Sequence, residues 1–389
     1  MTPMTPTVPS VHRDVVAGSA ADFMLVRRVV AAGSQVEIGR ALAEEARAAY
    51  GWAPVPADRT LARARRRWFE RNWPQHHARL QGAAQACGVD FEADAFHLDG
   101  LTGVPDGSAC SAAYCPPRQT AEGHALLGRN YDFFTTSQAA LFAMMSGRQV
   151  KDSAPPMASR PYVLESAPDD GPATTLLTMS ELDSAMEGVN EHGLAVALLV
   201  ADGENVKPPV DAGPQVGLAS TQLPRFLLDT CASVEEAKAA LLDAKQYDLG
   251  AALHYLVGDA TGAAFVWEHG AGGDEHVTES DGALCVTNHL LHRHRDVAAL
   301  PEDNPETMLS YGRYRSLHAS TGGAMSADRL RESLDEIRFD AATSDPYPVR
   351  TLWRTVFDLQ ERMMSAHFYL GDGEDGPRYS EEMVFSAAR

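Results

Sequence analysis

One cysteine, one arginine and one aspartate could form a nucleophilic centre if the two segments that carry them pair as strands. Cys110 lies in the run of small residues Ser108–Cys115, and Arg129 and Asp132 lie in a second run further along the chain. A cation lowers the pKa of a neighbouring thiol and a carboxylate can orient a nearby amine, so this combination could activate the sulfur for attack on a carbonyl. Cys115 is a competing candidate, which we interpret as a small buried side chain.

The two runs are typical of the strands of a hairpin. Residues 108–115 are small and tolerate a strand, and the second run alternates from Leu126 to Phe134. Between them, Pro116–Gly123 combines proline, glycine and polar residues in the manner of a turn. We therefore expect the thiol to lie across the hairpin from the arginine and the aspartate.

The rest of the chain must supply the scaffold for this hairpin. We expect strands at 23–30, 174–178, 194–200, 253–258, 263–268, 283–289, 351–358 and 363–370, and helices at 35–50, 59–87 with a break at Pro74, 220–229, 233–242, 309–317 and 326–337. Strand pairs alternate with helix pairs instead of single strands with single helices, which favours an α+β layered protein. Residues 1–20 are expected to form a disordered tail.

Composition narrows the class of protein. The chain has 389 residues, of which 44% are hydrophobic and 22% charged, as in an ordinary soluble globular protein. A net charge of −20 argues against nucleic acid or an anionic membrane as a partner. We find no secretory signal and no stretch near the roughly 18 apolar residues that span a bilayer. Five scattered cysteines suit a reducing compartment, so a cytoplasmic location is expected.

Neither a cofactor nor a metal is called for by the sequence. No glycine-rich phosphate loop stands between a strand and a helix. His289, His292 and His294 could suggest zinc, but their spacing is irregular, no cysteine completes the set, and Arg293 and Arg295 would repel a cation. We expect these histidines to lie in a loop at the rim of a pocket.

Several motifs resemble those of a known family. Cys-Ser-Ala-Ala-Tyr-Cys from Cys110 and Gly-Arg-Asn-Tyr-Asp-Phe-Phe from Gly128 resemble the start of the catalytic chain in the acyl-coenzyme A:isopenicillin N (6-aminopenicillanic acid) acyltransferase family. Glu-Ile-Gly from Glu37 and Thr-Asn-His from Thr287 match further motifs. This family belongs to the N-terminal-nucleophile hydrolases. The resemblance implies their four-layer αββα sandwich, with two antiparallel sheets face to face.

The resemblance also implies a precursor that cuts itself between Ala109 and Cys110. Residues 21–109 would then be a pro-segment that stays associated, as a small subunit, with the catalytic domain 110–389. The family commonly has glycine before the cleaved bond, so Ala109 is a departure.

By resemblance, the cysteine at the new chain end supplies both the nucleophile and the base. Asp132 would hold the amine of Cys110, Arg129 would stabilise the thiolate, and Asn288 would contribute to the oxyanion hole. Asn190 either donates to the same oxyanion or caps a turn through its side chain.

Arg350 matches a further arginine of the family, which stands just ahead of a strand in its active site. A surface charge is the alternative interpretation of this residue.

Together these expectations describe an enzyme that forms a thioester on Cys110 and passes the acyl group to water or an amine. Its partners would be a small-molecule acyl donor, an amide or an acyl thioester, and an amine acceptor. No cofactor, nucleic acid or membrane takes part, and a homo-oligomer is compatible with this scheme.

Two other functions stay open. One is an unprocessed relative that binds a ligand without turnover, and the other is a bile-salt or penicillin amidase that only hydrolyses. The lack of a signal peptide and of a cysteine near the initiator methionine disfavours the bile-salt type.

Overall fold

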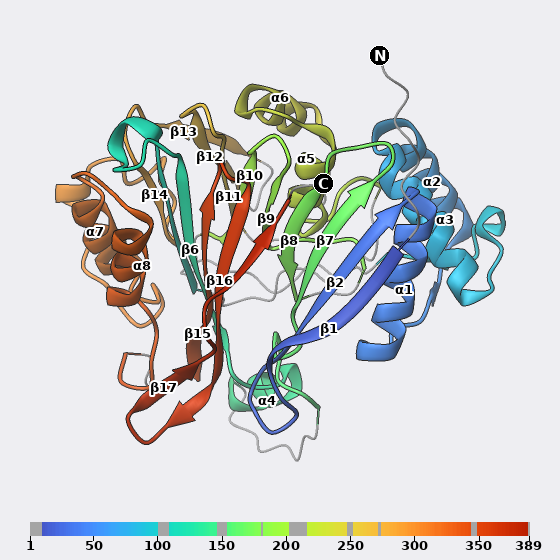
Figure 1. Ribbon diagram of the computed structural model, residues 1–389, viewed down its shortest axis with the longest axis horizontal. Helices are drawn as coiled ribbons and strands as arrows, with labels where there is room; N and C mark the ends of the chain where they lie inside the picture. The colour runs from blue at the N-terminus through green and yellow to red at the C-terminus, as the bar shows by residue number, and fades with distance from the viewer. Residues whose placement is uncertain are drawn as a thin grey trace.

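Two β-sheets lie face to face in this protein, and helices cover the outer side of each. The computed structural model describes residues 10–99, 109–145, 154–179, 182–201, 216–246, 252–270, 274–343 and 348–387. In Figure 1, α7 and α8 cover one outer side and α1, α2 and α3 lie on the other. The fold is therefore the α+β, four-layer αββα sandwich that was predicted.

Within the described segments, the first sheet has nine strands. In spatial order they are β1 (Ser10–Gly18), β2 (Leu25–Gly33), β7 (Tyr162–Pro168), β8 (Thr174–Thr178), β9 (Glu187–Asn190), β10 (Ala195–Val200), β11 (Leu253–Gly258), β12 (Ala264–His269) and β13 (Glu275–Glu279). Strand β2 pairs with β7 in parallel, so the expectation of purely antiparallel sheets is wrong at this point. The connection between the two strands is long and includes helices, so no tight turn imposes an antiparallel direction.

The second sheet has seven strands. They are β14 (Leu284–Val286), β5 (Ala109–Cys115), β6 (Leu126–Phe134), β15 (Val349–Asp358), β16 (Met363–Gly373) and β17 (Gly376–Tyr379), with β18 (Met383–Ser386) also paired to β16. The expected hairpin is present as β5 and β6, in which Cys110 lies opposite Tyr131 and Ala109 lies opposite Asp132. A short separate pair joins β3 (Val55–Pro56) to β4 (Phe96–His97).

Helices form the outer layers. They are α1 (Gln35–Tyr50), α2 (Arg59–Asn72), α3 (Pro74–Cys87), α4 (Gln138–Met145), α5 (Gln222–Thr230), α6 (Val234–Asp243), α7 (Ser310–Ser320) and α8 (Ala327–Glu336). Pro74 begins α3, as the sequence predicted, because a proline at the first helical position lacks only an N–H that would be unpaired anyway. Among the helices in the described segments, none combines the length and the apolar character needed to cross a membrane.

The part of the chain that precedes Ala109 is built into the sandwich. It supplies β1 and β2 to the first sheet and α1 to its helical layer. Helices α1 and α3 touch through glycines: a Cβ at Gly39 would lie 2.0 Å from the carbonyl oxygen of Arg79, and one at Gly82 would lie 2.0 Å from that of Val36. This close packing fixes α3 against the rest of the molecule.

The prediction of a disordered tail at residues 1–20 is wrong from Ser10 onward. Residues Ser10–Gly18 form β1, which pairs with β2 along most of its length. The strand lies at the edge of the sheet and is largely exposed, and its polar residues suit that position. An exposed edge strand lacks the apolar alternation from which a strand is usually predicted.

Candidate active site

Cys110 stands near the start of β5 with its thiol facing the space between the two sheets. Alternate residues of a strand point to opposite faces, so Cys110 shares its face with Tyr131 and Arg129 of β6. Nη2 of Arg129 donates to the sulfur at 3.3 Å. The pKa of the Cys110 thiol is raised, mainly because the thiol is buried. The charge of Arg129 opposes this rise, and the charge of Asp132 adds to it. The uncut chain therefore holds a neutral thiol.

Cys115 lies on the other face of β5. It belongs to a hydrophobic cluster with Leu330 and Leu334 of α8. Burial raises the pKa of its thiol to about 12. Its interpretation as a packing residue agrees with these surroundings.

Arg129 is held by an acidic residue that the sequence did not reveal. Glu187 of β9 forms an ion pair with Arg129, and both side chains are fully buried. Trp353 Nε1 and Thr355 Oγ1 donate to the other carboxylate oxygen of Glu187, at 2.9 Å and 2.8 Å. The guanidinium next to the sulfur is thus fixed in place and its charge is balanced.

Asp132 lies opposite Ala109 and is completely buried. Thr351 donates a hydrogen bond to its Oδ1. Its Oδ2 has no hydrogen-bond partner among the described residues, and Arg313 Nη1 lies 3.6 Å away. Burial raises the pKa of Asp132 to about 6, which Arg313 and Thr351 oppose. The Oδ2 atom of the buried Asp132 can therefore accept a hydrogen bond close to the start of β5.

Asn288 follows β14 and reaches the backbone of the nucleophile. Its Oδ1 accepts a hydrogen bond from the Cys110 N–H at 2.9 Å. Its Nδ2 donates to the carbonyl oxygen of Val200 at 2.6 Å, and its own N–H donates to Ser310 Oγ at 2.9 Å. The structure thus brings Cys110 and Asn288 together, as the sequence predicted.

Arg313 of α7 is a residue of the centre that the sequence analysis missed. Its Nη1 donates to the carbonyl oxygen of Cys110 and to Ser111 Oγ, both at 2.7 Å. Its Nη2 donates to Asn288 Oδ1 at 2.7 Å. Its spacing from the buried Leu317, four residues along the same helix, indicates only that Arg313 is buried and does not indicate its contact with Cys110.

The structure corrects the proposed oxyanion role of Asn190. Its Nδ2 donates to the carbonyl oxygens of Leu228 and Cys231, and its Oδ1 accepts from the N–H groups of His192 and Leu194. Both amide hydrogens are used, so the side chain caps a turn and the end of α5. Glu187, three residues earlier on the same strand, points toward Arg129, and alternation therefore directs Asn190 to the opposite face.

Arg350 is placed away from the reacting atoms. It lies opposite Phe133 in the pairing of β6 and β15, and its Nη2 is 2.7 Å from Asp372 Oδ2 of β16. The next residue, Thr351, is the one that contacts Asp132. The expectation that Arg350 belongs to the active site is therefore not supported, and its surface-charge interpretation fits the ion pair.

The bond between Ala109 and Cys110 lies in β5, where both residues are buried. Residues 100–108, which lead to this bond, lie outside the described part of the chain. A cavity of about 280 Å³ between α7 and α8 reaches Arg313 from the helical side of the sheet, with Ile337 and Phe339 among its lining residues. Cys110 is not among its lining residues, and the thiol faces the opposite side of β5, so this cavity meets the centre at Arg313 and not at the sulfur.

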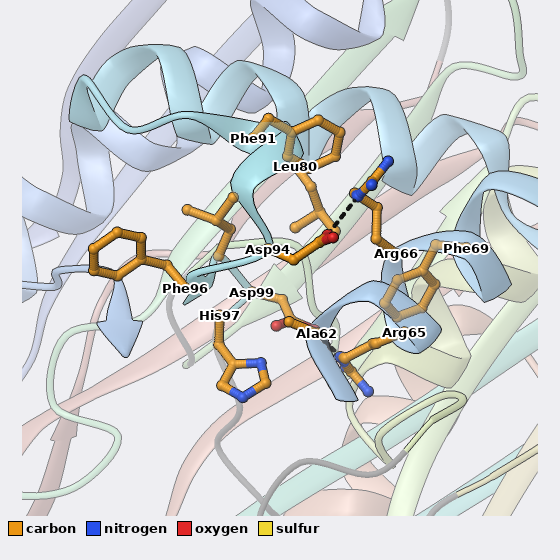
Figure 2. Close-up of a pocket in the computed structure, with 11 residues that line it drawn as sticks. Ala62, Arg65, Arg66, Phe69, Leu80, Phe91, Asp94, Phe96, His97 and Asp99 are labelled. Carbon is orange, nitrogen blue, oxygen red and sulfur yellow. Dashed lines mark hydrogen bonds and ion pairs between the residues drawn. The ribbon is translucent and has the colours of Figure 1, made fainter. Parts of the chain in front are cut away.

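A second cavity is formed by a different part of the chain. All of its lining residues fall between Ala62 and Asp99. Figure 2 shows Arg66 directed at Asp94 in this cavity, where their ion pair has a distance of 2.8 Å. Its volume of about 30 Å³ suits ordered water and is too small for a substrate.

Comparison with known proteins gives a family and distant structural likenesses. No curated protein sequence matches the chain. A mutant conjugated bile acid hydrolase from Clostridium perfringens is 14% identical, with 72% of this chain and 96% of that chain covered and a TM-score of 0.47. Penicillin V acylase from Agrobacterium tumefaciens is 15% identical, with 69% and 84% covered and a TM-score of 0.46. The Caenorhabditis elegans ortholog of N-acylethanolamine-hydrolyzing acid amidase is 13% identical, with 64% and 93% covered and a TM-score of 0.41.

The family model covers both the second strand of the hairpin and the segment that carries Asn288. It matches residues 119–373, which is more than half of the chain. The resemblance drawn from the sequence motifs is thereby confirmed. The chain belongs to the acyl-coenzyme A:6-aminopenicillanic acid acyl-transferase family.

Proposed function

We propose that the protein is a self-processing cysteine amidohydrolase or acyltransferase that carries an acyl group as a thioester on Cys110. One observation supports this most: two side chains contact Cys110, and a buried carboxylate lies opposite the residue before it. Arg129 contacts the sulfur of Cys110, Asn288 accepts from its nitrogen, and Asp132 keeps one carboxylate oxygen without a hydrogen-bond partner within the described residues. Membership of an acyltransferase family supplies the class of reaction.

Self-cleavage would create the catalytic base. The Cys110 sulfur attacks the carbonyl carbon of Ala109, the C–N bond breaks, and the nitrogen takes the thiol proton and becomes an amine. Water then hydrolyses the resulting thioester, which releases the carboxylate of Ala109 and frees the thiol. The products are residues 1–109, which contain the pro-segment 21–109, and the catalytic domain 110–389. An α-amine has a pKa of about 8, so near neutrality it can accept the proton of its own thiol.

The described contacts suit such an amine. Asn288 Oδ1 already accepts from this nitrogen while it is a peptide N–H. Asp132 offers its Oδ2 as a further acceptor, and an ammonium group beside it would lower the raised pKa of its carboxyl group. Arg313 holds the carbonyl oxygen of Cys110 and the side chain of Asn288, so it acts as a positioning residue.

Acyl transfer would follow on the same sulfur. The thiolate, supported by Arg129, attacks the carbonyl of an amide or an acyl thioester, and the leaving group takes a proton from the amine. The proposed donor to the oxyanion is Nδ2 of Asn288, which in the uncut chain donates to the carbonyl oxygen of Val200 and would have to turn to the substrate; one such donor contributes about 3 kcal/mol. Water or an amine then accepts the acyl group and restores Cys110. The five cysteines, all in described segments, are free thiols, and a cytoplasmic location would keep them reduced.

The decisive experiment is N-terminal sequencing with intact-mass measurement of the purified protein. We expect two associated fragments in place of one 41.9 kDa chain, the larger beginning at Cys110. The Cys110→Ala variant should stay a single chain. A wild-type protein that remains intact, with Cys110 inert toward acyl donors, would contradict the proposal and favour a relative that binds its ligand without turnover.

A second measurement distinguishes transferase from hydrolase. The processed enzyme is incubated with an acyl donor, with and without an amine acceptor. Formation of a new amide at the expense of the free acid identifies a transferase. Release of the free acid at an unchanged rate identifies an amidase.

A further inference from the structure

A group of histidine and acidic side chains lies on the edge of the first sheet, apart from the centre around Cys110. Glu268 of β12 and His276 of β13 are directly opposite each other in the strand pairing, so their side chains share one face. His292, from the loop after Asn288, lies on the same face. Its ring stacks on that of His276, with the centroids 3.7 Å apart. Asp274 Oδ2 lies 3.3 Å from Nε2 of His276.

Glu268 orients one of these histidines. It is almost completely buried, and one of its oxygens contacts Nδ1 of His292. The other oxygen accepts from the Leu291 N–H at 2.6 Å and contacts Nε2 of His254 at 2.7 Å. With Nδ1 of His292 engaged, its Nε2 is the atom left to bind a ligand. A carboxylate that holds the far nitrogen of an imidazole is the usual support of a metal-binding histidine.

We propose that Asp274, His276 and His292 bind a divalent transition-metal ion such as Zn²⁺. Each residue offers one ligand atom, and these atoms lie within 4.8 Å of one another. Bonds of about 2.0–2.2 Å to a tetrahedral zinc would bring such atoms to about 3.4 Å from one another. The side chains of His276 and Asp274 are 38% and 58% exposed, so they are able to make this small movement.

The chemistry of the three ligands suits this class of ion. Two imidazoles and one carboxylate are typical zinc ligands, and three protein ligands leave a fourth position for water. The net charge of −20 favours the approach of a cation. Arg293 and Arg295, which were expected to repel a metal, are exposed to water, where their charge is screened.

The proposed ligands differ from the three histidines that the sequence suggested, His289, His292 and His294. His289 does not join it, because Nδ1 of His289 faces Ser310 Oγ at 3.0 Å and its ring packs against Tyr311 and Tyr314. Two of the three ligands come instead from β13 and the residue before it. Only the pairing of β12 with β13 brings them to His292.

The ion would fasten the loop after Asn288 to the edge of the sheet. Glu268 connects the site to His254, whose Nδ1 donates to the carbonyl oxygen of Thr287 at 3.0 Å. Thr287 precedes Asn288 in the chain. The role inferred for the metal is therefore structural, and its binding does not depend on whether Cys110 is catalytic.

The test is a calorimetric titration of Zn²⁺ into the full-length protein after dialysis against a chelator. We expect one ion per chain, and His276→Ala and His292→Ala should each weaken binding by about tenfold or more. Glu268→Gln should weaken it by about tenfold, as loss of an orienting carboxylate does. Since the side chain of His276 is only partly buried, the His276→Ala variant is expected to fold even where a variant of the buried Glu268 does not.

The matched control is His12→Ala. His12 is an exposed histidine beside Asp14 on β1, another edge strand, and its side chain is 72% exposed. Zn²⁺ binding should be unchanged in His12→Ala. In a separate titration, Co²⁺ bound to the wild-type protein should give visible absorption bands that disappear in His292→Ala. Absence of saturable Zn²⁺ binding, or equal affinity in wild type and His276→Ala, would overturn the proposal.

Discussion

Two clusters of buried arginines and aspartates differ in how completely their charges are paired. The first, which we call the lock cluster, consists of His76, Arg79, Asp183, Arg225 and Asp229. Arg79 of α3 pairs with both aspartates. Arg225 Nε lies 3.3 Å from Asp183 and 3.1 Å from Asp229, and His76 Nδ1 lies 2.7 Å from Asp183. Burial alone would raise the pKa of Asp183, but Arg79 and His76 hold it well below its ordinary value.

The second cluster is the proposed catalytic centre, where the pairing around Asp132 is incomplete. Asp132 accepts from Thr351, but within the described segments its Oδ2 has no hydrogen-bond partner. The nearest cation, Arg313, is 3.6 Å away and donates its hydrogen bonds to other groups. The pKa of Asp132 is accordingly raised by burial to about 6.

The difference shows that burial and residue type do not by themselves separate a structural cluster from a reactive one. The lock cluster joins α3, in the proposed pro-segment, to α5, and every carboxylate oxygen in it has a cation within 3.3 Å. Among the described residues Asp183 Oδ1 also lacks a hydrogen-bond partner, so what distinguishes it from Asp132 Oδ2 is the shorter distance to a cation, 3.3 Å against 3.6 Å. Such a network would keep the two fragments together after cleavage. The proposed centre instead leaves one acceptor oxygen, which would suit the amine of Cys110 that the proposed cleavage would create.

The largest effect is expected when the lock cluster is broken. Arg79→Met leaves Asp183 and Asp229 buried without their shared partner, and removal of one partner from a buried pair costs about 3–5 kcal/mol. Urea unfolding should show this loss. Arg329→Met, which breaks an exposed pair with Glu332 on α8, is the control and should cost at most about 1 kcal/mol. Equal losses in the two variants would contradict the structural role of the lock cluster.

The next effect separates the two asparagines. Asn288→Ala should slow acyl transfer by about 10²–10³-fold, equivalent to about 3–4 kcal/mol, because an oxyanion donor is lost. Asn190→Ala removes hydrogen bonds to backbone groups, so it should cost about 1–3 kcal/mol of folding stability and leave the rate of the folded enzyme unchanged. Steady-state kinetics with urea unfolding measures both. The reverse pattern would return the oxyanion role to Asn190.

The pH dependence of stability should differ in sign between the clusters. The folded-state pKa of Asp132 is raised from 3.8 to about 6. Its stabilising contribution to the free energy of unfolding is therefore fully present below about pH 4 and is lost as the pH rises to about 6. Two pKa units correspond to about 3 kcal/mol. Asp183, whose pKa is lowered, contributes above about pH 4 and loses its contribution as the pH falls.

Unfolding of the uncut Cys110→Ala protein across this range measures the sum of these contributions. Adding Asp132→Asn should remove the loss between about pH 4 and 6 while the acid loss remains. Identical curves for the two proteins would mean that Asp132 titrates normally in the folded state.

The sequence was sufficient where the structure depends on neighbouring residues. The β5–β6 hairpin follows from two strand-forming runs and a turn, so the positions of Cys110, Arg129 and Asp132 could be predicted from local patterns. Helix α1 was predicted with its bounds from the apolar face formed by Ile38, Leu42 and Ala46, and the structure shows a capping box of Ser34 and Glu37 at its start.

The sequence was insufficient where a residue's role depends on distant pairing. Asn190 and Asn288 both follow apolar segments, and only the pairing of the short strand β9 directs Glu187 toward Arg129 and Asn190 away from it. Arg313 meets Cys110 because α7 packs on β5, across a sequence separation of 203 residues that no local pattern reports.

The smallest predicted effect concerns the one hydroxyl that supports Asp132. In the Cys110→Ala background, Thr351→Val removes the donor to Oδ1 of the carboxylate. The ionised form loses about 1 kcal/mol, so the pKa of Asp132 should rise by somewhat under one unit and the loss of stability should move to higher pH. The substitution also deprives the Phe339 N–H of its acceptor at 2.8 Å, which lowers stability at every pH.

The informative quantity in this variant is therefore the midpoint of the pH transition in unfolding free energy, and not the total stability. Thr351→Ser, in the same Cys110→Ala background, keeps the hydroxyl and should restore the midpoint of the Cys110→Ala protein. A midpoint in Thr351→Val that stays in place or moves to lower pH would show that Asp132 draws its support from another group. In that case Oδ1 of Asp132 would be held by another donor, and the contrast with the lock cluster would depend on Oδ2 alone.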